Sequence, residues 1–246
     1  MDISTIKKLT ELNNQFYKQI ATDFSDSRRY SWRGWEQSWA EIENLLPNNP
    51  KILDVAAGNL RYKKFLEKKL DNFSYLAIDS CEPLMLLGKP EEKQYRTIDA
   101  IVELVENSSV DTLSKKLDGQ TFDLVVCFGF MHHIPSRELR KLFIENLINL
   151  LEPSGILVIT FWQFMRNERL KNRVVDPQIL EIGDLEENDY IVDWQWGQKA
   201  YRYCHHADDN EIGELMDQFK NLKLLAEFHA DGENNNNKYL ILQKQV

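Results

Sequence analysis

The chain has few cysteines and no long apolar run, and both shortages limit the classes of protein to which it can belong. Its three cysteines, Cys81, Cys127 and Cys204, are scattered through 246 residues and form no Cys-x-x-Cys pair. Such a set is a poor disulfide framework, so we expect reduced thiols. No apolar run approaches the roughly 20 residues that a membrane-spanning helix needs, and the N-terminus lacks the pattern of a secretory signal. The sequence therefore predicts a cytoplasmic protein without a membrane partner.

Positive charge is also scarce, because 30 lysines and arginines face 39 acidic residues and give a formal net charge of −9. A charge of this sign opposes any large nonspecific attraction to a polyanion. A nucleic-acid partner would therefore need a local basic face. Four segments are candidates, although each also fits an ordinary solvated surface: Arg28-Arg29 with Arg33, residues 61–69, Arg137 with Arg140 and Lys141, and residues 166–173.

The length of the chain predicts one domain with extensions and a sizeable core. Helical periodicity covers residues 3–24 and 35–46 and stops at Pro47 and Pro50, which is a clear boundary. We therefore expect residues 1–50 to form an N-terminal helical cap. Residues 51–246 are expected to form the main domain, in which strands and helices alternate.

Seven strands are predicted in this main domain, with helices between them. The strands cover residues 51–55, 75–79, a segment ending near 99, 122–128, 156–162, 223–230 and 238–244. The helices cover residues 62–69, 83–87, 102–117, 136–151 and 208–219. A turn-rich loop at 231–237 makes the last two strands an antiparallel hairpin. Residues 163–203 break the rhythm, and a long insertion at this edge of a sheet usually builds a lid or a substrate wall.

The segment from Lys51 to Asp79 carries the clearest chemical signal. An apolar run ends in the small-residue turn Ala56-Ala-Gly58 and passes into a helical pattern, and a second apolar run ends in Asp79 about twenty residues later. In a parallel sheet this places a tight turn and a diol-binding acid at the carboxyl ends of neighbouring strands, where nucleoside cofactors bind. Gly58 can adopt the backbone conformation that a close approach requires. A plain strand-turn-helix, with Asp79 as a helix cap, is the alternative.

A second polar cluster follows the fourth predicted strand, where His132 and His133 stand side by side. Adjacent histidines point in different directions, and no acidic residue lies at a ligand spacing, so we predict no metal site. One histidine could act as a general base. The alternative is that one packs under a cofactor and the other holds the loop.

The alternation of strands and helices, closed by an antiparallel hairpin, resembles the class I S-adenosylmethionine-dependent methyltransferase fold. The first motif of that family, Asp-x-Gly-x-Gly-x-Gly, reads Asp54-Val-Ala56-Ala-Gly58-Asn-Leu60 here. The resemblance implies an α/β, Rossmann-like fold with a seven-stranded, mostly parallel sheet, and it implies S-adenosylmethionine as cofactor. It also implies a set of cofactor-binding residues: Asp54 for the amine, Ala56 and Gly58 for the methionine portion, Asp79 for the ribose, Asp99 and Ala100 for the adenine, and Cys127 and Met131 beside the cofactor.

Three segments are similar to a narrower family, the eukaryotic tRNA wobble-uridine carboxymethyl methyltransferases. These segments are Phe16 to Arg28 with Trp32, the pair Phe161-Trp162, and Asp189 to Trp194 followed by Ala200-Tyr-Arg-Tyr-Cys-His205. The chain departs from the family at Asp193, where the family has proline, and at Cys204, where it has tyrosine. The resemblance implies that the protein esterifies the carboxylate of a 5-carboxymethyluridine in tRNA, and that a small activator subunit is a possible partner.

Esterification of a carboxylate fits the residues of these segments. A carboxylate has a pKa near 4 and is already a nucleophile at neutral pH, so no general base is required. Arg202 is the first choice to hold one carboxylate oxygen, and Arg28 is the second. Aromatic residues could stack on a flipped base or wall the cofactor, although core packing is the alternative for each: Tyr17, Trp32, Trp194, Tyr201 and Tyr203. The expected catalytic residues are thus Arg202, His132 and Tyr203, and Tyr17 and Arg28 are expected to contact the cofactor.

Two other functions stay open. A methyltransferase for a small acid or another metabolite fits the acidic charge better and needs no basic face. A cofactor-binding subunit without activity of its own would fit the glycine-poor turn.

Overall fold

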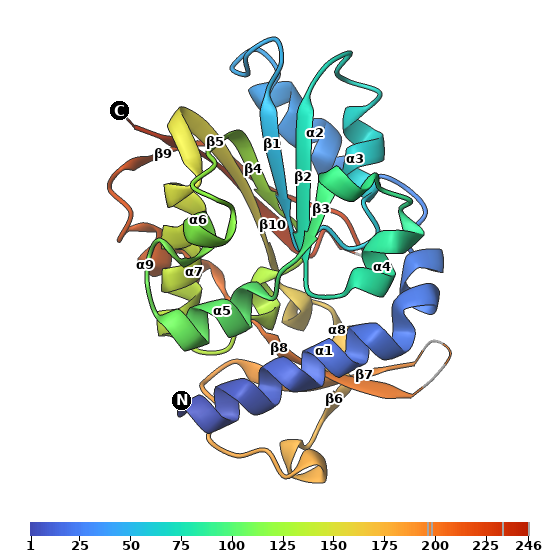
Figure 1. Ribbon diagram of the computed structural model, residues 1–246. Helices are drawn as coiled ribbons and strands as arrows, with labels where there is room; N and C mark the ends of the chain where they lie inside the picture. Colours follow the sequence, from blue (N-terminus) through green and yellow to red (C-terminus); the bar gives the residue numbers. More distant parts are fainter. Residues whose placement is uncertain (196, 198, 233, 246) are drawn as a thin grey trace.

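The computed structural model describes residues 1–195, 197, 199–232 and 234–245. Its centre is a seven-stranded sheet of order β3-β2-β1-β4-β5-β10-β9 (Figure 1). The strands are β1 (Lys51–Val55), β2 (Ser74–Asp79), β3 (Tyr95–Thr97), β4 (Phe122–Cys127), β5 (Leu151–Trp162), β9 (Leu222–Ala230) and β10 (Asn237–Lys244). The first five run parallel, and β10 pairs antiparallel with both β5 and β9. This arrangement confirms the predicted fold class.

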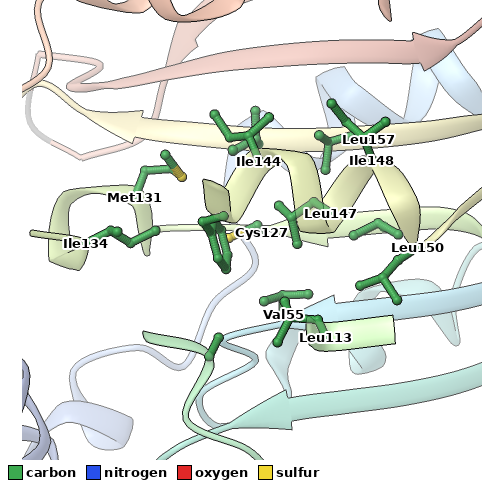
Figure 2. Close-up of a cluster of buried hydrophobic side chains, with 14 of the residues drawn as sticks. Val55, Leu113, Cys127, Met131, Ile134, Ile144, Leu147, Ile148, Leu150 and Leu157 are labelled. Carbon is green, nitrogen blue, oxygen red and sulfur yellow. The ribbon is translucent and has the colours of Figure 1, made fainter. Parts of the chain in front are cut away.

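Helices cover both faces of the sheet because its central strands are apolar on both sides. Leu53 and Val55 of β1 pack against one group of helices, whereas Ile52 packs against another. The first group is α5 (Ala100–Asn107), α6 (Thr112–Lys116), α7 (Arg137–Asn149) and α9 (Asp209–Met216), and the second is α2 (Arg33–Ile42) and α3 (Arg61–Leu66). Figure 2 shows the first group's core, where Ile144 and Leu147 of α7 lie in one cluster with Val55 and Leu157.

One predicted helix is divided in the structure. The sequence pattern favoured a single helix over residues 102–117, but the chain forms α5 and α6 with a break between them. Ser108 ends α5 in the left-handed conformation, with φ of 48°. The Asn146 side chain then donates a hydrogen bond to the Ser109 carbonyl at 2.9 Å. Polar groups from α7 thus satisfy the backbone where the helix is interrupted.

A second, three-stranded antiparallel sheet lies beside the carboxyl edge of the main sheet. It contains β6 (Val174–Val175), β7 (Asp189–Trp194) and β8 (Ala200–His205), in that order. The segment 163–203 also contains α8 (Glu168–Lys171) and the 3₁₀ turns Phe164–Arg166 and Pro177–Leu180, and residues 196 and 198 lie outside the described residues. This position is where the sequence placed a substrate wall.

The long helix α1 (Ile3–Asp26) packs along this small sheet, as Figure 1 shows. The Asn13 side chain pairs with the backbone of β8, since it accepts from Tyr203 N at 2.8 Å and donates to Tyr203 O at 3.3 Å. Phe16 meets Trp194 of β7 edge to face, with 5.8 Å between the ring centroids. The helix α1 therefore joins the small sheet to the edge of the main one. No helix in the described ranges is both long and apolar enough to cross a membrane.

Candidate active site

A pocket of about 610 Å³ opens where the parallel strands end. Its lining comes from the loops after β1, β2, β3 and β4, from α1, and from the small sheet. The volume lies in the range of small-molecule sites. The pocket-lining side chains divide by charge. Asp54 lies near the end of β1, Asp79 ends β2 and Asp99 follows β3. Arg28 and Arg202, in contrast, approach from the loop after α1 and from β8. We call these two parts the acidic end and the arginine end.

The turn after β1 shapes the acidic end, and three of its residues are left-handed. Ala56, Gly58 and Leu60 have φ of 58°, 55° and 58°. A Cβ added to Gly58 would meet only the Leu84 side chain, at 3.8 Å, so the backbone conformation and not crowding calls for glycine there. Leu60 is 1% exposed and packs into the core outside the pocket lining. The leucine in place of the third glycine therefore does not fill the pocket.

Asp79 holds this turn in place from the end of β2. Its Oδ2 accepts from Gly58 N and its Oδ1 from Cys81 N, both at 2.8 Å. Burial raises the pKa of Asp79 to about 6, although these two hydrogen bonds act in the opposite direction. A carboxylate has about four acceptor sites, so this side chain keeps capacity for two hydroxyl donors from a ribose.

The other two acids are fixed by different partners. Asp54 is 2% exposed and its Oδ2 accepts from the Tyr75 hydroxyl at 2.7 Å, while burial raises its pKa to about 7. Asp99 caps α5, since its Oδ1 accepts from Ile101 N and Val102 N. Its Oδ2 accepts from Asn14 Nδ2 at 2.6 Å. The helix cap thus uses only Oδ1 of Asp99, and Oδ2 is hydrogen-bonded to Asn14 of α1.

The arginine end combines guanidiniums with aromatic rings. The Arg202 guanidinium lies 4.9 Å from the Trp162 ring centroid, and its Nη1 is 3.5 Å from the Tyr17 hydroxyl. The Arg28 guanidinium lies 3.6 Å from the Phe24 ring centroid. Burial lowers the pKa of Arg28 to about 9, so it stays charged at neutral pH. Neither arginine has a carboxylate ion-pair partner among the residues that the structure describes.

The two adjacent histidines lie between these ends and are neutral. Burial lowers the pKa of His133 to about 3 and that of His132 well below its usual range. His133 Nε2 is 2.7 Å from the Tyr17 hydroxyl, and His133 Nδ1 is 3.2 Å from the Tyr203 carbonyl. His132 Nδ1 has no hydrogen-bond partner in the described part of the chain, and its ring meets Trp162 at 4.9 Å.

Potential metal-ligand atoms of His132, His133 and Cys204 lie within 4.8 Å of one another. A cation is nevertheless disfavoured here, because both His133 nitrogens are engaged and the Arg202 charge acts on both histidines. The absence of a metal site stays a prediction.

The structure brings ten of the expected site residues to the pocket and places three elsewhere. The pocket is lined by Tyr17, Arg28, Asp54, Ala56, Gly58, Asp79, Asp99, Ala100, His132 and Arg202. Cys127 and Met131 were expected beside the cofactor, but their side chains point into the core between β4 and α7 (Figure 2). Tyr203 was expected to be catalytic, but it is fully buried and donates to Asp189 Oδ1 at 2.7 Å. These three residues therefore have packing roles, because they face away from the pocket.

Sequence reasoning missed Asn14 and gave Trp162 no role at the site, although both line the pocket. Asn14 reaches Asp99 only because α1 crosses the sheet edge, and no local pattern marks such a contact.

Of the basic segments, Arg137 and Arg140 form ion pairs with Glu214 and Glu211 and lie outside the pocket lining. Arg61, Arg169 and Arg173, in contrast, line the pocket with the two arginines already named.

Comparison with known proteins agrees with this geometry. A family model described as a methyltransferase domain matches residues 53–157, from β1 to β5. The tRNA (carboxymethyluridine(34)-5-O)-methyltransferase of Arabidopsis thaliana is 24% identical over 164 residues, which are 65% of this chain and 36% of that protein. The enzyme with the same activity name, ALKBH8 of Mus musculus, is 23% identical over 175 residues, or 71% of this chain and 23% of that protein. Both matches span well under two thirds of the relatives' own length.

Solved structures share the whole fold. The 1,6-didemethyltoxoflavin-N1-methyltransferase of Burkholderia thailandensis, with 1,6-didemethyltoxoflavin and S-adenosylhomocysteine bound, has a TM-score of 0.62 and 14% identity. The likeness covers 98% of this chain and 91% of that one. At this identity the likeness shows the fold, which is that of the class I S-adenosylmethionine-dependent methyltransferases.

The fold and the family match together identify an enzyme. Residues 53–157 match the methyltransferase domain family, and the chain has the class I S-adenosylmethionine-dependent methyltransferase fold, which together support S-adenosylmethionine as its cofactor. The pocket fits that cofactor, because Asp79 has unused acceptor sites and the left-handed turn at Gly58 leaves space beside it. Within this class, the curated proteins that the chain resembles include the tRNA carboxymethyluridine methyltransferases.

Proposed function

We propose that this chain transfers a methyl group to the carboxylate of a 5-carboxymethyl-type uridine at the wobble position of tRNA. One observation carries the proposal. Arg28 and Arg202 face the pocket that holds the three acids, and neither is paired with a carboxylate within the described ranges. Two partly desolvated guanidiniums without a counter-ion favour an anionic ligand, and a carboxylate matches the geometry of a guanidinium.

The neutral histidines are consistent with this acceptor. A carboxylate is ionised at neutral pH, so His132 and His133 need not remove a proton from it. S-adenosylmethionine supplies an electrophilic methyl group when it is bound. Arg202 is proposed to hold one carboxylate oxygen and leave the other free to attack, and Asp54, Asp79 and Asp99 are proposed to bind the cofactor. The rings of Trp162 and Trp194 are proposed to wall the acceptor.

Five further features stay predictions. Residues 163–203 are proposed to serve as the substrate wall, and residues 1–50 as the cap over the cofactor. The tRNA partner and a small activator subunit follow from the family that the sequence resembles, and local arginines would have to compensate for the net charge of −9. A cytoplasmic location stays a prediction from the sequence pattern.

A methylation assay tests the proposal. The protein is incubated with labelled S-adenosylmethionine and tRNA that carries unesterified 5-carboxymethyluridine, and the nucleosides are identified by mass analysis before and after alkali. Base-labile label on the wobble uridine is the expected result, because esters hydrolyse in alkali. Label that resists alkali would contradict carboxyl methylation.

Arg202→Gln gives the assay its structural test. Loss of a hydrogen bond to a charged group costs about 1.5–3 kcal/mol, so we expect turnover to fall roughly 10- to 150-fold. Cofactor affinity should be unchanged, since Arg202 lies at the other end of the pocket. The matched control is Arg137→Gln, because Arg137 is an exposed arginine on α7 that pairs with Glu214 outside the pocket. Equal turnover by Arg202→Gln and the wild type would remove Arg202 from the site.

A methyltransferase for a small carboxylic acid is the second candidate. The net charge of −9 favours it, and the same two arginines could hold any small carboxylate. Ester formation on free acids but not on tRNA would support it. A cofactor-binding subunit without activity of its own is the third, and cofactor binding without transfer to either acceptor class would support that candidate.

A further inference from the structure

A loop beside the pocket mouth exposes an aromatic ring between arginines. The segment of residues 27–33, which consists of the loop between α1 and α2 and the first residue of α2, reads Ser-Arg-Arg-Tyr-Ser-Trp-Arg. We call it the rim loop. Tyr30 in it is 85% exposed, the highest value among the large apolar side chains that the structure describes as exposed. Among the residues that the structure describes, the Tyr30 ring has no aromatic neighbour and the Tyr30 hydroxyl has no hydrogen-bond partner. Packing thus gives no reason for tyrosine here.

The backbone of the rim loop is nevertheless fixed to the cofactor turn. Arg61 Nη1 donates to the Tyr30 carbonyl at 2.8 Å, and Asn59 Nδ2 donates to the Arg28 carbonyl at 3.4 Å. Arg61 itself lies 5.5 Å from the ring centroid of Trp32, which lines the pocket. The exposed ring is therefore held beside the mouth of the pocket by contacts to its own main chain.

The charged side chains next to Tyr30 in the rim loop are positive. Arg28, Arg29 and Arg33 flank it within the loop, in a chain whose total charge is negative. Arg29 pairs with Asp26 at 2.9 Å, but these side chains are 69% and 59% exposed, and exposed pairs are weak. Arg33 donates to the neutral Asn235 Oδ1. The loop thus offers cations that can be redirected to phosphates, with an aromatic platform between them.

We propose that Tyr30 stacks on the nucleotide next to the one whose base enters the pocket, while Arg29 and Arg33 contact the adjoining phosphates of a single-stranded RNA loop. The proposal rests on the proposed function, because it needs a polynucleotide substrate. Once one base is bound beside Arg28 and Trp32, its neighbour in the strand must leave through the mouth that the rim loop borders. Aromatic stacking with flanking arginines is how proteins bind unpaired bases without a fixed sequence.

The test measures RNA binding separately from methyl transfer. A fluorescein-labelled anticodon stem-loop RNA is titrated with protein in the presence of S-adenosylhomocysteine, and anisotropy gives the Kd. Tyr30→Ala should raise the Kd by roughly 5- to 150-fold, whereas Tyr30→Trp should stay within about threefold of the wild type. Val110→Ala is the control, since Val110 is 45% exposed and lines no part of the pocket. Arg29→Ala and Arg33→Ala should each reduce the salt slope of binding by about 0.7.

Two further measurements separate this proposal from the proposed function. Tyr30→Ala should bind S-adenosylhomocysteine as the wild type does and should methylate the free 5-carboxymethyluridine nucleoside equally well. If RNA affinity depends on Tyr30 but no ester forms on uridine, the stacking role stands and the proposed function fails. If tRNA is esterified and Tyr30→Ala binds RNA normally, the stacking role is wrong. A wild type that binds no RNA, or a Tyr30→Ala variant that loses only a protein partner, would also overturn it.

Discussion

Substitution of Asp79 gives the most specific prediction, because its carboxylate both holds the turn after β1 and is proposed to bind the ribose. It accepts from Gly58 N and Cys81 N at 2.8 Å each, and it is proposed to accept from the two ribose hydroxyls. In Asp79→Asn, the side chain keeps one acceptor oxygen, and its amide nitrogen now faces a donor. Each hydrogen bond to a charged group contributes about 1.5–3 kcal/mol. A loss of about 3 kcal/mol in cofactor binding is therefore expected, which weakens the Kd roughly 150-fold.

Calorimetry with S-adenosylhomocysteine measures this effect directly. The control is Asp71→Asn, since Asp71 is an exposed acid between α3 and β2 that lies outside the pocket lining. Urea unfolding of both variants shows whether the turn has been disturbed, and we expect Asp79→Asn to lose about 1–3 kcal/mol in the free energy of unfolding. If Asp79→Asn is folded and binds the ligand as tightly as Asp71→Asn, the assignment of the ribose site to the end of β2 is wrong.

Three other predictions follow from the same pocket. Cofactor affinity should fall as the pH is lowered from about 8 to 5, because the carboxyls with pKa of about 7 (Asp54) and about 6 (Asp79) must be ionised to bind the cofactor. Calorimetry across this range should show that the affinity of Asp54→Asn changes less with pH at the upper end of the range than that of the wild type. A wild-type affinity that does not change with pH would contradict the assignment of these two acids to the cofactor site. Ala56→Gly should raise the free energy of unfolding by about 1 kcal/mol, because φ of 58° is costly for alanine. Ala57→Gly, whose φ is not positive, should lower it by about 0.5–1 kcal/mol, and the opposite order in urea titrations would refute the strain argument. Treatment with EDTA should leave methyl transfer to the free nucleoside unchanged, because His133 has both nitrogens engaged; a loss that Zn²⁺ restores would show a metal site.

The chain sequence by itself determined the sheet and its acidic end. Apolar runs of strand length that end in Asp54 to Gly58, in Asp79 and in Asp99 are local signals, and parallel strands bring their carboxyl ends to one edge. The positions of these acids were therefore predictable from spacing alone. The break at Ser108 was not predicted, because partners from α7 decide it through the tertiary packing.

Only the tertiary structure decided which residues of the distant segments reach the pocket. Tyr203 and Arg202 are neighbours on β8, and alternation along a strand sends one into the core and the other into the pocket. Sequence could not tell which, since both residue types suit a binding site. The contact of Asn14 with Asp99 likewise exists only because α1 crosses the strand ends. Local patterns specify elements and turns, whereas the side chains that meet across 85 or more residues are selected by how those elements pack.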